Sequence, residues 1–138
     1  MSATPNFANT PNLGTNLVNA RAVSTANTNR DGTGTIEDLV MGGANGTRID
    51  RVNVKATSTT AAGYIVFYIK DGASNYAVIH EMVVTAVGTV DATHASFEDE
   101  WVRTDGQPVV ELPSGWKLGV STTIAQGFHV TPVVSGDF

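Results

Sequence analysis

The chain contains no cysteine, which excludes a disulfide framework and any metal site built from thiolates. Charged residues are scarce as well, at 15% of 138 residues. No apolar run approaches the roughly 18–20 residues that cross a bilayer. The first residues also lack the charged and apolar regions of a secretory signal. We therefore expect a protein that is made in the cytoplasm and has no membrane partner.

Basic residues are few, and this bears on nucleic acid as a partner. The chain has eight Lys and Arg against 13 Asp and Glu, a formal net charge of −5. The basic residues are scattered along the chain and never adjacent. Affinity for duplex nucleic acid depends largely on phosphate neutralisation by clustered Lys and Arg. The composition therefore argues against a nucleic-acid partner.

Motifs that carry chemistry are also missing. The sequence has no Gly-rich phosphate loop and no Ser in a nucleophile-elbow signature. Its three histidines, His80, His94 and His129, are too far apart in sequence to form a ligand pair at helical or strand spacing. We interpret them as surface or hydrogen-bonded structural residues. The sequence predicts neither an enzyme nor a bound metal or cofactor.

Two acidic stretches are the remaining candidates for a hard cation. In the run Glu98-Asp99-Glu100, a strand would place Glu98 and Glu100 on one face, where they could bind Ca²⁺ or simply discourage edge pairing. The loop of residues 29–34 resembles a Ca²⁺ loop but lacks its alternating ligands and terminal Glu. A charged strand face and a turn are the interpretations that we favour.

What the chain does contain is a repeated pattern of strands and turns. Apolar residues alternate with polar ones, and Gly, Asn and Asp mark the turns, while Thr and Val are abundant. A chain of this length suits one domain. We predict an all-β fold, a single jelly-roll-like β-sandwich of about eight strands spanning residues 17–138. The expected strands are residues 17–25, 35–41, 48–56, 63–70, 75–85, 95–103, 116–123 and 127–134, with a bulge near Asp50.

The stretch GYIVFYIK, residues 63–70, is apolar on both faces. It should be a central strand, covered on one side by the core and on the other by a neighbour or a partner subunit. Tyr64, Val66 and Tyr68 share one of these faces and are candidate partner-binding residues. Trp101 and Trp116 alternate in register with other apolar residues, which favours core packing over an exposed sugar-binding platform.

Residues 1–16 differ from the rest of the chain. They contain Pro5, Pro11 and repeated Asn, with few apolar side chains, and this composition suits neither a helix nor an interior strand. We predict an extended arm that becomes ordered on a partner, with Phe7, Pro11 and Leu13 as candidate contacts. The alternative is a frayed terminus without a binding role.

Three stretches together resemble small virion structural proteins of tailed bacteriophages, the head decoration or cement proteins. They are residues Ser24–Thr35, Gly43–Gly72 and the ending Ser135–Phe138. The resemblance implies an all-β protein without enzymatic activity, located on the capsid surface of a virion and made in the host cytoplasm. It implies that the major capsid protein is the partner, with self-association into a homotrimer or another homo-oligomer. It supplies no catalytic or ligand-binding residues.

Three other functions stay open at this point. A tail or fibre component would be a structural protein of the same particle. A carbohydrate-binding module would need exposed aromatic rings or a bound Ca²⁺, and a small hydrolase would need a carboxylate pair in a cleft. The dispersed carboxylates of Asp31, Glu37, Asp71 and Asp91 nominate no such pair.

Overall fold

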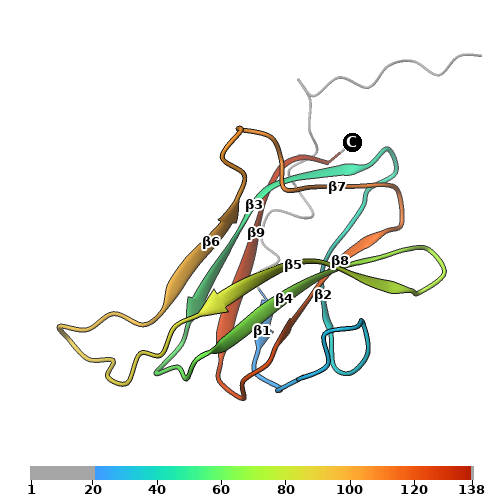
Figure 1. Cartoon of the computed structure of the whole chain (residues 1–138). Coiled ribbons are helices and arrows are strands. Elements are labelled where there is room, and N and C mark those ends of the chain that lie inside the picture. Colours follow the sequence, from blue (N-terminus) through green and yellow to red (C-terminus); the bar gives the residue numbers. More distant parts are fainter. Residues whose placement is uncertain (1–20, 138) are drawn as a thin grey trace, which may run out of the picture.

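A computed structural model describes residues 21–137, which form nine strands in two antiparallel sheets (Figure 1). No helix occurs among these residues. The predicted β-sandwich is therefore confirmed. The strands are β1 (Arg21–Val23), β2 (Glu37–Met41), β3 (Thr47–Ala56), β4 (Gly63–Lys70), β5 (Tyr76–Val84), β6 (Glu98–Val102), β7 (Val110–Leu112), β8 (Lys117–Thr122) and β9 (Phe128–Asp137).

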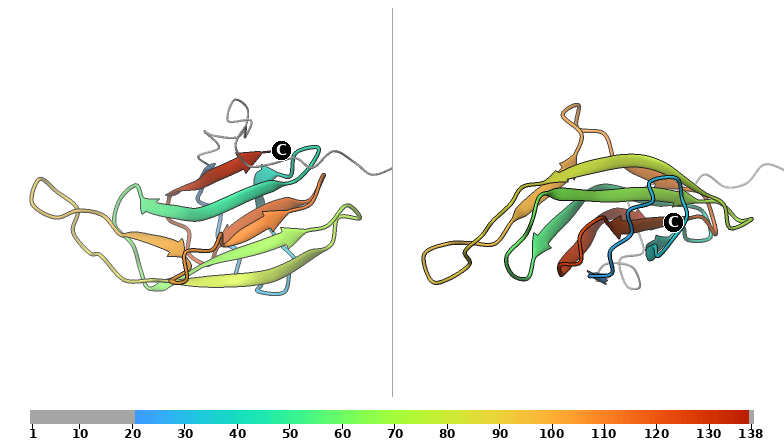
Figure 2. Two further views of the ribbon diagram at one scale, coloured as in Figure 1. Left: turned by 90° about the horizontal axis from the view of Figure 1, so that it is seen from above. Right: turned by 60° about the horizontal axis from the view of Figure 1, so that its bottom comes forward.

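The strand order shows how the chain builds the two layers. The first sheet has the order β1-β9-β3-β6, and β7 pairs with the other half of β3. The second sheet has the order β2-β8-β4-β5. Both sheets are visibly curved (Figure 2). Apart from β7, the pairs β1–β9, β2–β8, β3–β6 and β4–β5 follow the order of one long hairpin wound into two sheets. This is the connectivity of a jelly roll, as predicted.

Most strand predictions agree with the structure, and one strand was missed. Residues 63–70 form β4 with the predicted bounds. The predicted bulge near Asp50 is confirmed by a register shift between Ile49 and Arg51 where β3 pairs with β9. The missed strand, β7, lies inside the predicted loop of residues 104–115. It has only three residues, which is too short for alternation to give a signal.

The core lies between the facing sides of the two sheets. On β3, Ile49, Val52 and Val54 have no exposed area, while Arg51, which lies between Ile49 and Val52, is exposed. Phe128 and Val130 on β9 repeat this pattern from the neighbouring strand. The period-2 alternation of the sequence thus marks which face of each strand is buried.

Strand β4 is the exception, because it is buried on both faces. Ile65 and Phe67 belong to the core between the sheets. Val66 and Tyr68 face the other way and still have no exposed area. Part of the cover over Tyr68 comes from the segment between β1 and β2, residues 24–36, which we call the β1–β2 segment. The Tyr68 hydroxyl donates to the Asn29 carbonyl at 3.3 Å, which places this segment over the outer face of β4.

Asn27 holds the β1–β2 segment in its folded shape. Its Nδ2 donates to the carbonyls of Thr33 and Thr35 at 2.9 and 3.0 Å. Its Oδ1 accepts from the backbone N–H of Asn29 at 3.0 Å. Its own N–H donates to the carbonyl of Thr122 on β8 at 2.8 Å. One side chain that is only 5% exposed therefore closes the loop and lies against the second sheet.

Replacing Asn27 by Ala should weaken the fold, because two backbone carbonyls would lose their donor while partly buried. We expect Asn27→Ala to lower the free energy of unfolding by about 1–3 kcal/mol. Thr28→Ala is the matched control, since Thr28 is exposed on the same segment. Urea unfolding of both variants measures the difference. Equal stability of the two variants would show that the segment is not held by Asn27.

Candidate functional surface

The acidic run of β6 lies at an edge of the first sheet. Glu100 of this run forms an ion pair with Arg51 of β3, with Nε and Oε1 2.7 Å apart. An open hollow of about 530 Å³ lies over this region, between β6, β3 and β9. Its lining residues are Arg51, Asn53, Glu98, Asp99, Glu100, Thr131 and Val133. The three carboxylates of the run are exposed on an edge strand, and one of them is paired with a guanidinium, which is the arrangement of a charged strand face.

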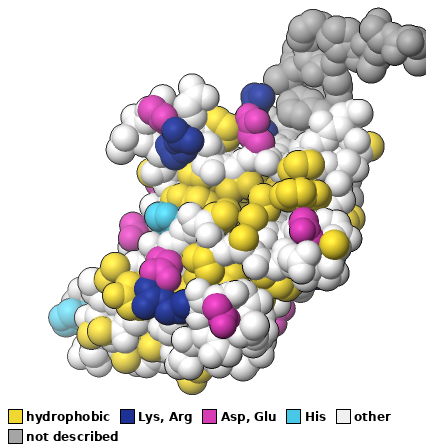
Figure 3. Space-filling view, turned by 45° about the vertical axis from the view of Figure 1, so that its right-hand side comes forward, with side chains coloured by type: hydrophobic (Ala, Val, Ile, Leu, Met, Phe, Trp, Pro, Cys, Tyr) yellow, Lys and Arg dark blue, Asp and Glu magenta, His cyan; other side chains and the backbone are white. Residues whose placement is uncertain are grey.

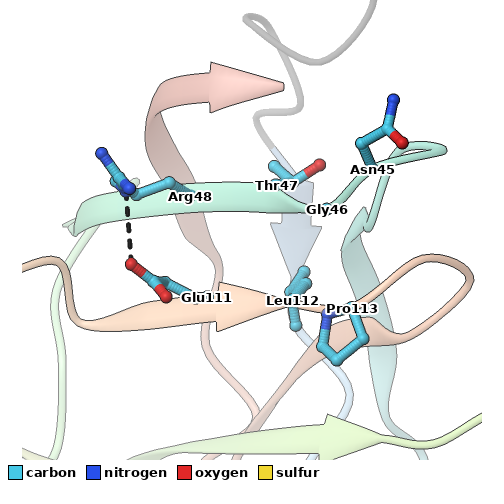
Figure 4. A pocket seen from close by; sticks show the side chains of 7 residues that line it. All are labelled: Asn45, Gly46, Thr47, Arg48, Glu111, Leu112 and Pro113. Atoms are coloured by element: carbon cyan, nitrogen blue, oxygen red, sulfur yellow. Dashed lines mark hydrogen bonds and ion pairs between the residues drawn. The ribbon is translucent and has the colours of Figure 1, made fainter. Parts of the chain in front are cut away.

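A second hollow, of about 350 Å³, lies beside the start of β3 and the end of β7 (Figure 4). Arg48 of β3 and Glu111 of β7 face each other across it, with Nε and Oε1 3.3 Å apart. Its lining residues are Asn45, Gly46, Thr47, Arg48, Glu111, Leu112 and Pro113. None of these seven is a His, Cys, Ser or Lys, so the lining supplies no activated nucleophile of those types.

Four dispersed aspartates have structural roles in turns. Each carboxylate accepts a hydrogen bond from the backbone N–H two residues further on, at 2.8–3.1 Å. The four are Asp31, Asp71, Asp91 and Asp105. In each case hydrogen bonds to the carboxylate hold the pKa of the group below its ordinary value. Carboxylates with lowered pKa values stay ionised at neutral pH and are poor general acids.

The three histidines do not form a metal site. His94 lies beside Asp91, with Nδ1 and Oδ1 2.8 Å apart, and His129 is exposed on β9. His80 projects from β5. Within the described part of the chain, no group of three His, Cys, Asp or Glu side chains is placed to hold a metal ion.

His80 contributes to an aromatic cluster where the edges of the two sheets meet. Its ring stacks on that of Trp101 from β6, with centroids 4.5 Å apart and planes inclined by 2°. Phe67 of β4 lies 4.9 Å from the same indole ring, centroid to centroid. One face of the half-buried Trp101 is therefore occupied by the imidazole. Burial lowers the pKa of His80, and the nearby carboxylates of Asp99 and Glu81 oppose that shift.

Arg30 fastens the β1–β2 segment to β5. Its guanidinium forms an ion pair with Glu81 and lies 4.3 Å from the centroid of the Tyr64 ring. The hydrogen bond from Arg30 is the main reason that the pKa of Glu81 is lowered. The only carboxylate of β5 is thus already paired inside the molecule.

The predicted partner-binding residues fall into two groups. Phe7, Pro11 and Leu13 lie outside the described residues, as does the whole predicted arm of residues 1–16. Of the second group, Tyr64 is half-buried under Arg30, while Val66 and Tyr68 have no exposed area. Contact of Val66 and Tyr68 with a partner stays a prediction that would require the covering parts of the chain to move, in the case of Tyr68 the β1–β2 segment.

Strand β5 carries three of the six large apolar side chains that are exposed among the described residues. Val78, Ile79 and Val83 are 36%, 39% and 59% exposed. A space-filling view shows hydrophobic side chains in a band across one face of the molecule, with ionic side chains around it (Figure 3). Sequence analysis did not single out these residues. The available signal was the two apolar runs YAVI and MVV in the stretch YAVIHEMVV, where a half-buried strand would alternate.

Comparison with known proteins gives no match, whether to a protein family, to a curated protein or to a solved structure. No helix long and apolar enough to cross a membrane occurs in the described residues.

The stacked His80 predicts how stability depends on pH. Because its pKa in the folded chain lies below the ordinary 6.5, the unfolded chain binds this proton more readily. The contribution to stability is therefore complete above pH 6.5 and falls as the pH drops below that value. We expect His80→Phe, which keeps a ring on Trp101, to flatten this part of the profile. Urea unfolding of the intact chain and of this variant between about pH 7.5 and about pH 5 measures the profile, and an unchanged pH dependence in His80→Phe would contradict the prediction.

Proposed function

We propose that the protein is a non-enzymatic structural protein of a bacteriophage particle. In this proposal it is a decoration or cement protein that binds the outer surface of the major capsid protein shell and stabilises it. It would be made in the host cytoplasm and reside on the capsid surface. The link to a virion comes from the three sequence stretches that resemble such proteins.

The observation that carries the proposal concerns two kinds of side chain among the described residues: carboxylates that already have partners within the chain, and apolar side chains that are exposed. Many of the carboxylates are used in turns and ion pairs, as at Asp71, Asp105 and Glu81. Three of the six large exposed apolar side chains among these residues lie on one strand, β5. A surface with exposed apolar side chains, on which the carboxylates are held in turns and ion pairs, is suited to binding another protein.

The stretches that carry the resemblance have definite places in the fold. The first, residues 24–35, belongs to the β1–β2 segment over the second sheet. The second, residues 43–72, contains β3 and β4, the strands around which both sheets are arranged. The resemblance therefore covers elements that determine the shape of the sandwich, which supports a shared architecture.

A particle-binding assay tests this function. Particles that lack the protein are mixed with the intact chain or with a chain that lacks residues 1–16, at matched concentration. We expect the shortened chain to fold with a similar melting temperature, because the described sandwich lies outside the deleted residues. Its occupancy on the particles should fall, because arm contacts would exist only in the assembly.

Single substitutions locate the effect within the arm. Phe7→Ala should reproduce part of the loss, about 2 kcal/mol or more, as expected for an aromatic anchor at an interface. Asn6→Ala is the matched control and should bind as the intact chain does. Equal occupancy of intact and shortened chains would remove the arm from the proposal. No binding of the intact chain to particles would overturn the cement function itself.

A further inference from the structure

Free strand edges are the sites where a β-sandwich can add another strand, and proteins usually protect them. In this fold β1 has three residues and β7 has three, so both offer little to pair with. Strand β2 has five residues and contains a register shift between Asp38 and Val40. Strand β6 has five residues, three of them the carboxylates Glu98, Asp99 and Glu100. Each of these edges is short, irregular or strongly charged.

Strand β5 is the edge without such protection along its second half. It has nine residues and pairs only with β4 among the described strands. Its single carboxylate, Glu81, is held by Arg30. A register shift near Ile79 interrupts the ladder, which leaves residues 80–84 as a regular stretch of five. Val83, the most exposed of the large apolar residues, lies in this stretch at 59%.

We propose that residues 80–84 of β5 pair antiparallel with the same residues of a second copy of this chain. Two four-stranded sheets would then become one continuous sheet across a two-fold axis at Met82. This register places Val83 of one copy opposite Glu81 of the other. It avoids the direct opposition of two like charges that a centre at Glu81 would create.

A second copy fits this edge because of charge and length. The chain carries a net charge of −5, so copies repel unless they meet where carboxylates are few or paired. If two copies paired through β6, the carboxylates of Glu98, Asp99 and Glu100 in one copy would lie against the same three carboxylates in the other. The edge of β5 brings two neutralised Glu81 side chains and exposed Val83 side chains together. The partner strand also has, by identity, the same regular length and the same bulge.

The inference specifies the geometry of the self-association that the resemblance implies, and in this respect it rests on the proposed function. A two-fold interface uses the same patch on both copies and closes at two subunits. Of the states that the resemblance allows, a homotrimer or another homo-oligomer, it therefore favours a dimer.

Sedimentation of the full chain over a range of concentrations tests the proposal. We expect a monomer–dimer equilibrium that Val83→Glu shifts at least tenfold toward monomer, because each new carboxylate would lie directly opposite Glu81 of the other copy. Val102→Glu is the matched control, since Val102 is 52% exposed on the edge of β6, and it should associate as the intact chain does. Melting temperatures show that both variants are folded.

Cross-linking identifies the strand, and the absence of cysteine makes it selective. Val83→Cys should be joined into dimers by a short bismaleimide, while Val102→Cys should stay monomeric. A chain that is monomeric at every concentration, a trimeric mass, or dissociation by Val102→Glu in place of Val83→Glu would each overturn the proposal. Dimers that survive Val83→Glu but are lost on removal of residues 1–16 would assign association to the arm and would also overturn it. No particle enters these measurements, so they can fail or succeed independently of the cement function.

Discussion

Burial of β4 on both faces is the constraint on which the arrangement of the molecule depends. Phe67 must face the first sheet, and Tyr68 must be covered from the opposite side. The chain meets the second requirement with the β1–β2 segment, which Asn27 closes and Arg30 fastens to Glu81. At Gly34, where φ is +84°, an added Cβ would lie 2.4 Å from Asn27 Oδ1, so a larger residue would force the two apart. A strand apolar on both sides thus determines the shape of a loop about thirty residues earlier in the chain.

How much of the fold could be predicted from sequence depends on how far apart along the chain the interacting residues lie. Local sequence patterns were sufficient for two strands: alternation located β3 and the bulge near Asp50, and a continuous apolar run located β4. The cover over Tyr68 was predicted, but its source was not, because hydrogen bonds from Asn27 to Thr33 and Thr35 leave no periodic signal. Strand β7 was missed because three residues cannot display a period.

The candidate surface was harder to predict than the fold. Sequence reasoning chose Tyr64, Val66 and Tyr68 for their apolar face, which the structure places largely under the chain itself. It did not choose Val83, because exposure depends on which strand lies at the edge of a sheet. That position follows from strand order, and strand order is set by the pairing of distant segments. The acidic residues show the same limit, since the turn roles of Asp71 and Asp105 appear only once backbone donors are placed.

The position of β9 has a consequence for the order of events during synthesis. This strand is the last of the described chain, yet it lies between β1 and β3 in the first sheet. Until its residues leave the ribosome, β1 lacks its neighbour among the described strands, and β3 has only β6 and β7 of those strands beside it. The edge of β3 that pairs with β9 therefore stays without its partner strand through most of translation. Topologies that depend on such distant pairing fold slowly, so this protein passes through a period in which unprotected strand edges are exposed to the crowded interior of the cell.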